Sequence, residues 1–174
     1  MLIAHEKLKT NIVEYILYMY HIEDMIRANH FSIDELETTI ISKYTVSSEQ
    51  QGEIRSWYQV LIEQMKKEDV LEEGHLSTLG EMVFNLNDLH LQLINTLEEN
   101  LYLEQYQFAS PFIKELKDKM NKPELTEIEV CFNGLYGFML LKMKGKTVSE
   151  ETSEAMVVFS QLLRYLSKKF HERV

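Results

Sequence analysis

The chain has 174 residues, 45% of them hydrophobic, and carries a formal net charge of −10. This length and composition suit one globular domain with a sizeable core, and the negative charge repels a phosphate backbone, so we expect no nucleic-acid partner. Only two prolines and six glycines interrupt the chain, which favours long helices and argues against a sheet-rich fold with many tight turns.

The first predicted helix covers residues 8–29. Its buried face is indicated by apolar residues at helical spacing, among them Ile12, Ile16, Met19, Ile22 and Ile26. Glu23 interrupts this face, and Arg27 follows four residues later, in the order that favours an i,i+4 ion pair. Because a buried charge is costly without a partner, both side chains are candidates for a polar cluster.

Three further helices are predicted over residues 32–43, 47–69 and 78–99, with a loop at 70–76. A Ser or Thr followed three residues later by Glu or Gln marks the start of each as a capping box: Ser32 with Glu35, Ser47 with Gln50, and Thr78 with Glu81. In the last of these helices, His90 projects inside the apolar arc and therefore needs a polar partner.

The second half of the chain predicts three more helices. Pro111 suits the first turn of a helix over residues 112–120 that is capped by Ser110, whereas residues 100–111 fit either a helical turn or an extended crossover. A helix over about residues 124–145 ends at Gly145, and Ser149 caps the final helix, whose first turn carries Glu150 and Glu151.

The helix at 124–145 is apolar almost all round, which predicts burial among other helices. Gly134 and Gly137 weaken it, so we expect close approach of another helix or of a flat ligand. We therefore predict an all-α bundle of about six or seven mostly antiparallel helices around this central helix. Residues 1–174 form a single domain in this prediction, with lobes at 1–76 and 77–174 as the alternative.

Two groups of motifs resemble a known family. They are Lys9-Thr10-Asn11-Ile12 with Glu14-Tyr15-Ile16-Leu17-Tyr18-Met19 and Ile22-Glu23-Asp24, and Glu127-Ile128-Glu129 with Cys131-Phe132 and Leu135-Tyr136-Gly137. With these residues, nearly the whole chain resembles a small family of all-helical bacterial proteins catalogued only as a domain of unknown function. The resemblance implies a bacterial source and a compact helical domain, and it brings no site residues with it.

The residues point to no familiar catalytic or metal chemistry. The only Glu-x-x-His pair, Glu72 and His75, falls in the 70–76 loop rather than on a helix, and Cys131 is expected to be a buried apolar residue rather than a nucleophile.

The single cysteine excludes an intrachain disulfide framework. The first residues lack the apolar run of a signal peptide, and we expect a cytoplasmic protein without membrane contact, metal, cofactor or catalytic residues.

Two functions remain open. The first is a protein-interaction or regulatory helical module, in which Met-rich and aromatic helix faces bind a protein partner or a second copy of the chain to give a homo-oligomer. The alternative is a small-molecule-binding protein or enzyme with a ligand pocket beside Glu23, Arg27 and His90. The alternative requires these three side chains to meet in one cluster.

Overall fold

The structure is a computed structural model that describes residues 2–95 and 100–173 of the chain. Over these residues it contains eight α-helices, one 3₁₀-helix and no strand, so the prediction of an all-α fold is confirmed. The elements are α1 (Leu2–Thr10), α2 (Ile12–Ala28), α3 (Ile33–Thr39), η1 (Ile41–Lys43), α4 (Ser48–Lys67), α5 (Ser77–Asn95), α6 (Asn100–Met120), α7 (Glu127–Met143) and α8 (Glu150–Glu172). None of these helices is long and apolar enough to cross a bilayer.

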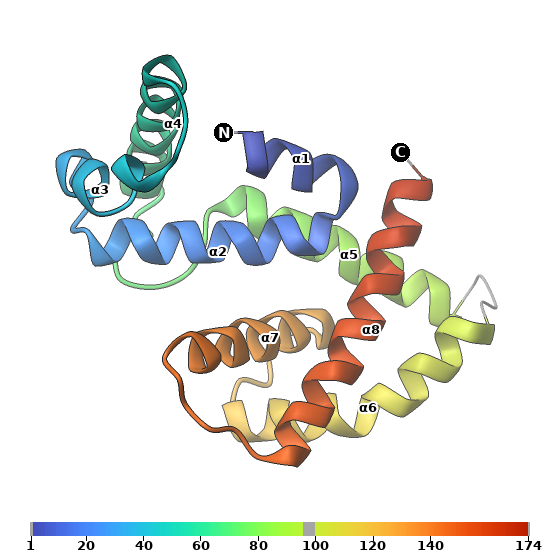
Figure 1. Cartoon of the computed structure of the whole chain (residues 1–174). Coiled ribbons are helices and arrows are strands. Elements are labelled where there is room, and N and C mark those ends of the chain that lie inside the picture. The colour runs from blue at the N-terminus through green and yellow to red at the C-terminus, as the bar shows by residue number, and fades with distance from the viewer. Residues whose placement is uncertain (1, 96–99, 174) are drawn as a thin grey trace. The chain divides into compact units, whose positions relative to one another are not determined.

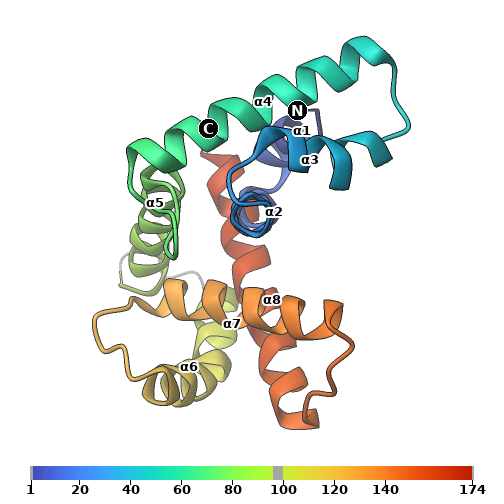
Figure 2. The same ribbon diagram turned by 90° about the vertical axis from the view of Figure 1, so that its left-hand side faces the viewer.

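The chain divides into two compact units. The first contains Met1–Lys9 and Glu14–Glu81, and in it α3, η1 and α4 pack against one another (Figure 2). The second contains Thr10–Val13 and Met82–Val174, and in it α6, α7 and α8 pack together in all three pairings (Figure 1). Large side chains fill each core: Leu36, Tyr58, Ile62 and Met65 in the first, and Tyr102, Phe132, Phe159 and Leu163 in the second.

A break at Asn11 separates α1 from α2, which is why the helix predicted over residues 8–29 begins later than expected. Asn competes for local hydrogen bonds and so favours helix starts over helix interiors. Here the Asn11 side chain accepts a hydrogen bond from the Ser167 hydroxyl (2.9 Å). The N–H of Ile12, which has no partner inside its own helix, donates to His171 Nε2 (3.1 Å). Residues 10–13 belong to the second unit, and within that unit α8 holds them through these two hydrogen bonds.

Most predicted caps are present. Ser47 and Gln50 form the complete capping box at the start of α4. Ser149 accepts the N–H of Thr152 at the start of α8. Ser32 caps α3 by accepting the N–H of Glu35, although the Glu35 carboxylate binds His30 instead of closing the box. Beyond α7, Gly145 has a positive φ of 65°, the left-handed conformation that commonly ends a helix.

Two predicted helix starts are wrong. Helix α5 begins at Ser77, so Thr78 lies inside it rather than at its cap. Helix α6 begins at Asn100 and contains Pro111 in its interior, so the predicted cap at Ser110 does not form. Proline removes one backbone hydrogen bond, and the carbonyl of Gln107 accepts the Ser110 hydroxyl in its place (3.4 Å). The end of the helix predicted to residue 99 lies outside the described residues.

The predicted central helix is present as α7, but its burial is uneven. Thr126 and Glu129 form a capping box at its start, and the apolar residues of the first half, Ile128, Val130, Cys131 and Phe132, are fully buried. Residues 133–140 are only half-buried, and Leu141 and Met143 are 43% and 60% exposed. The expectation of complete burial is therefore wrong for the second half of this helix.

Candidate functional site

Glu23 of α2 is a fully buried carboxylate in the first unit. Its Oε1 atom accepts the backbone N–H of Leu76 (3.0 Å), and its Oε2 atom accepts a hydrogen bond from Nδ1 of His75 (2.5 Å). The His75 ring stacks on Tyr20, with ring centroids 3.4 Å apart. A helix N-terminus presents N–H groups that have no acceptor inside the helix. The buried Glu23 carboxylate therefore finds a hydrogen-bond donor at the start of α5.

Arg27 binds the same loop one turn further along α2. Its Nη2 atom donates to the carbonyl oxygens of Val70 (3.1 Å) and Gly74 (2.5 Å). Its Nη1 atom pairs with Asp24 (2.9 Å), so the predicted i,i+4 pair with Glu23 is replaced by an i,i+3 pair. The side chain is only 13% exposed. Glu23 and Arg27 therefore act together as a clamp on residues 70–76, and Gly74 supplies the positive φ of 82° that the loop needs.

His90 of α5 lies in the second unit, and its ring is buried. Its Nδ1 atom contacts the hydroxyl of Tyr102 (2.7 Å) and its Nε2 atom contacts Oε2 of Glu127 (3.1 Å). An ionised carboxylate only accepts, so Nε2–H donates to Glu127, and in a neutral ring Nδ1 accepts the Tyr102 proton. Tyr106 donates to the other oxygen of Glu127 (3.2 Å). Both ring nitrogens of His90 are thus occupied within the protein.

The electrostatics of this cluster follow from its hydrogen bonds and burial. The hydrogen bond from His90 lowers the pKa of the Glu127 carboxyl, and Tyr106 adds to this effect, although burial acts in the opposite direction. Burial, followed by the nearby Glu127 charge, raises the pKa of Tyr106 to about 12. Burial also raises the pKa of the Cys131 thiol. Cys131 therefore stays protonated, as expected for a buried apolar residue and not for a nucleophile.

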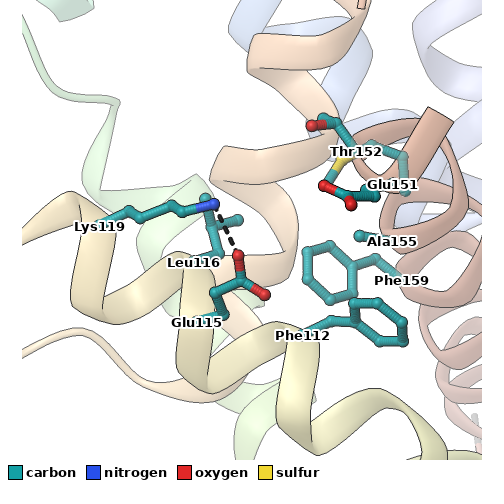
Figure 3. Close-up of a pocket in the computed structure, with 9 residues that line it drawn as sticks. Phe112, Glu115, Leu116, Lys119, Glu151, Thr152, Ala155 and Phe159 are labelled. Atoms are coloured by element: carbon teal, nitrogen blue, oxygen red, sulfur yellow. Dashed lines mark hydrogen bonds and ion pairs between the residues drawn. The ribbon is translucent and has the colours of Figure 1, made fainter. Parts of the chain in front are cut away.

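A hollow of about 360 Å³ lies between α6 and α8 of the second unit (Figure 3). Phe112, Leu116 and Phe159 supply its apolar lining. At its edge Lys119 pairs with Glu115 (2.6 Å), as the dashed line in Figure 3 shows. Small-molecule sites combine an apolar lining with a few polar groups that fix the ligand. Here the cation and one of the carboxylates satisfy each other, so the hollow does not indicate a particular ligand.

The comparisons with known proteins add one finding. The family model described as "Domain of unknown function (DUF4924)" matches residues 1–174. The chain belongs to the DUF4924 family. No curated protein and no solved structure matches it. The family description assigns no function, so the function of this DUF4924 chain has to be argued from its own residues.

The sequence named Glu23, Arg27 and His90 as candidate ligand-binding residues of this DUF4924 chain. Glu23 and Arg27, both on α2, bind the 70–76 loop of the first unit, whereas the partners of His90 are Tyr102 and Glu127 of the second. Their role in ligand binding stays a prediction. Over the described ranges, no group of three or more His, Cys, Asp or Glu side chains is arranged to hold a metal ion.

Sequence reasoning missed His75, which had been assigned only to a loop. It is the partner of a fully buried carboxylate, and its side chain remains 26% exposed. The signal in the sequence was the buried charge of Glu23, which requires a donor. No spacing rule connects the two residues, because they are 52 positions apart.

Proposed function

We propose that this DUF4924 chain is a helical protein-interaction module whose binding surface is the α8 face. We define the α8 face as the exposed side of α8 with the apolar side chains that flank it: Val157 of α8, Leu101 and Phe108 of α6, and Leu135 and Phe138 of α7. The family match leaves the function open, and the proposal rests on the exposure of this surface.

The observation that carries the proposal is a set of large apolar side chains left in solvent beside one helix. Leu101, Phe108 and Val157 are 58%, 60% and 56% exposed. Single exposed apolar residues are ordinary on a protein surface, but a group that lines adjoining grooves marks an interaction site. Aromatic side chains such as Phe108 are also enriched where proteins bind each other.

Grooves run along both sides of α8. The groove against α6 has a volume of about 230 Å³ and is lined by Leu101 and Phe108, and the groove against α7 has about 430 Å³ and is lined by Leu135 and Phe138. Gln161 of α8 borders both of them. Helix α8 is therefore a ridge between two partly apolar grooves, a shape that suits packing against helices of another chain.

A photo-crosslinking experiment in cells tests this proposal. A benzophenone amino acid replaces Phe108 on the α8 face and, as the control, Val60 on α4, which is 52% exposed and lies in the first unit. We expect a crosslinked protein product at position 108 and none at position 60. Equal yields at the two positions, or no product at 108, would overturn the proposal.

The module is proposed to act in the cytoplasm, where the lone buried thiol of Cys131 stays reduced.

A small-molecule function is the second candidate, and one observation favours it. Glu23 binds Nδ1 of His75, whose side chain is 26% exposed, and no other hydrogen bond to this ring is present among the described residues. A carboxylate orients a general base in this way. Native mass spectrometry of gently purified protein tests this candidate. A bound mass that is present in the wild type and lost in a folded Glu23→Gln variant would support it. The unmodified chain mass in both proteins would exclude it.

A further inference from the structure

Six exposed residues form a continuous stripe along α8. They follow one another at alternating intervals of four and three residues, the spacing that keeps side chains on one side of a helix. The stripe is Glu150, Glu154, Val157, Gln161, Arg164 and Lys168, and every one of its members is exposed. The opposite side of α8 is the buried one, through Met156, Phe159, Leu163 and Leu166. The stripe is thus the ridge of the α8 face.

The order of charges along this stripe is symmetric about its middle. Glu150 and Lys168 each stand nine positions from residue 159, Glu154 and Arg164 each stand five, and Val157 and Gln161 each stand two. If the stripe is reversed about residue 159, every acidic position falls on a basic one. A helix with this property is complementary to a second, antiparallel copy of itself.

The helix dipole explains only the outer part of this pattern. The dipole favours acids in the first turn and bases in the last, and its effect fades beyond those turns. Glu154 lies in the second turn of α8, and Arg164 stands eight residues before its end at Glu172. The two innermost charges therefore need another reason to be where they are.

The charges of the stripe gain little from their own chain. Glu150 and Glu154 are like charges at i,i+4, as are Arg164 and Lys168, and such pairs weaken a helix. Within residues 2–95 and 100–173, no ion pair is made by Glu150, Glu154 or Arg164. Lys168 makes a long contact of 3.8 Å with Glu172. The inner charges are therefore available to a partner of opposite sign at each position.

We infer that the occupant of the α8 face is a second copy of this chain, with the two α8 helices antiparallel across a two-fold axis near residue 159. This inference rests on the proposed interaction function and names its partner. The two-fold axis makes each contact twice, so Glu154 meets Arg164 of the second copy at two places, and Glu150 meets Lys168 at two more. Each of these contacts lies on the ridge, and the apolar grooves on both sides of α8 receive the flanking side chains of the other copy.

Charge reversal tests this arrangement directly. Sedimentation velocity of the full chain over a concentration series measures the dissociation constant of the dimer. In Glu154→Lys or in Arg164→Glu, two attractive contacts become two repulsive ones, and we expect the dissociation constant to rise about tenfold or more, since an exposed pair contributes a factor of about 1.5 to 5. In the double variant the two charges have exchanged places, and we expect recovery to within about threefold of the wild type.

Matched controls come from α6. Lys114 and Asp118 are exposed and paired with each other, so Lys114→Glu and Asp118→Lys repeat the same charge changes away from the α8 stripe. We expect neither to change the dissociation constant by more than about twofold. Circular dichroism checks that every variant keeps the helical content of the wild type.

Three results would overturn the inference: a monomer at all concentrations, a dimer that neither single reversal weakens, or a double variant that does not recover. A monomer whose position 108 still crosslinks to a different protein would remove the second copy while leaving the interaction function intact. A dimer insensitive to the reversals, with no crosslink at position 108, would remove both.

Discussion

The two glycines of α7 provide a matched test of how this helix is packed. A Cβ atom at Gly134 would lie 2.7 Å from Leu116 Cδ2 and 3.3 Å from atoms of Met156 and Phe159. A Cβ atom at Gly137, three residues later, would meet nothing within 4 Å. The close approach predicted for both glycines is thus present at Gly134 and absent at Gly137 over the described chain. Replacing each by alanine separates packing from helix propensity.

The expected magnitudes follow from two opposing terms. Alanine is more favourable than glycine in a helix interior by about 1 kcal/mol at either position. At Gly134 the added methyl group overpacks a filled site, which costs about 1–3 kcal/mol. The contact at 2.7 Å is with the end of the flexible Leu116 side chain, which borders the hollow in Figure 3, so we expect a cost of about 2 kcal/mol. Gly137→Ala then stabilises by about 1 kcal/mol, and Gly134→Ala destabilises by about 1 kcal/mol.

Urea unfolding followed by circular dichroism measures this difference. With a typical slope of about 2 kcal/mol per molar urea, the two midpoints should differ by about 1 M. The comparison is controlled internally, because both variants gain the same helix propensity on the same helix. Equal stabilisation by the two alanines would refute the packing of α7 against Leu116, Met156 and Phe159.

Three further predictions concern the buried polar groups. Arg27→Ala should lower the free energy of unfolding by about 3 kcal/mol because it leaves carbonyls of the 70–76 loop unpaired. Chemical denaturation measures this loss. Full stability in Arg27→Lys would show that the several donors of the guanidinium group are not needed. His90 lowers the pKa of Glu127 in the folded state. The Glu127–His90 pair therefore stabilises the fold fully above pH 4.5, the ordinary pKa of the Glu127 carboxyl, and this stabilisation is lost as pH falls through the folded pKa. Glu127→Gln should therefore flatten the fall in stability between about pH 5 and pH 3, and an unchanged pH profile would argue against the pair. Cys131, whose thiol pKa is raised by burial, should react with a thiol reagent at mildly alkaline pH only as fast as the protein unfolds, and rapid labelling of folded protein would show that it is accessible.

Caps were predictable from the sequence wherever the partner is local. Ser47 and Ser149 find their donors within three residues, so a short motif contains the whole interaction. The start of α5 was predicted incorrectly because its donors are taken by distant carboxylates: Glu23 accepts the N–H of Leu76, and Glu68 accepts the N–H of Ser77. Neither of these carboxylates belongs to the local motif, so the motif does not show where the helix begins.

For the candidate site, the sequence predicted which polar residues are buried but not their partners. Helical periodicity placed Glu23 and His90 inside apolar faces, and both are fully buried. Burial implies that each needs a partner, but periodicity carries no information on which one. His75 and Glu127, the partners found, are 52 and 37 positions away. Whether Glu23, Arg27 and His90 share one cluster depends on distances between helices. The spacing of residues along a single helix gives no such distance.

Helices α7 and α8 differ in what their sequence patterns say about their exposed surfaces. Helix α7 is apolar almost all round, yet Leu141 and Met143 near its end are exposed, so its hydrophobicity exceeds what its own unit buries. Helix α8 has a clear division into an apolar side and a polar side, and amphipathicity alone treats the polar side as solvated. Along the stripe the order of charge is acidic at Glu150 and Glu154 and basic at Arg164 and Lys168, and amphipathicity does not register this order. The inner charges, Glu154 and Arg164, make no ion pair within the described chain and fall on each other when the stripe is reversed, which is why we infer that the partner is a second copy of the same helix.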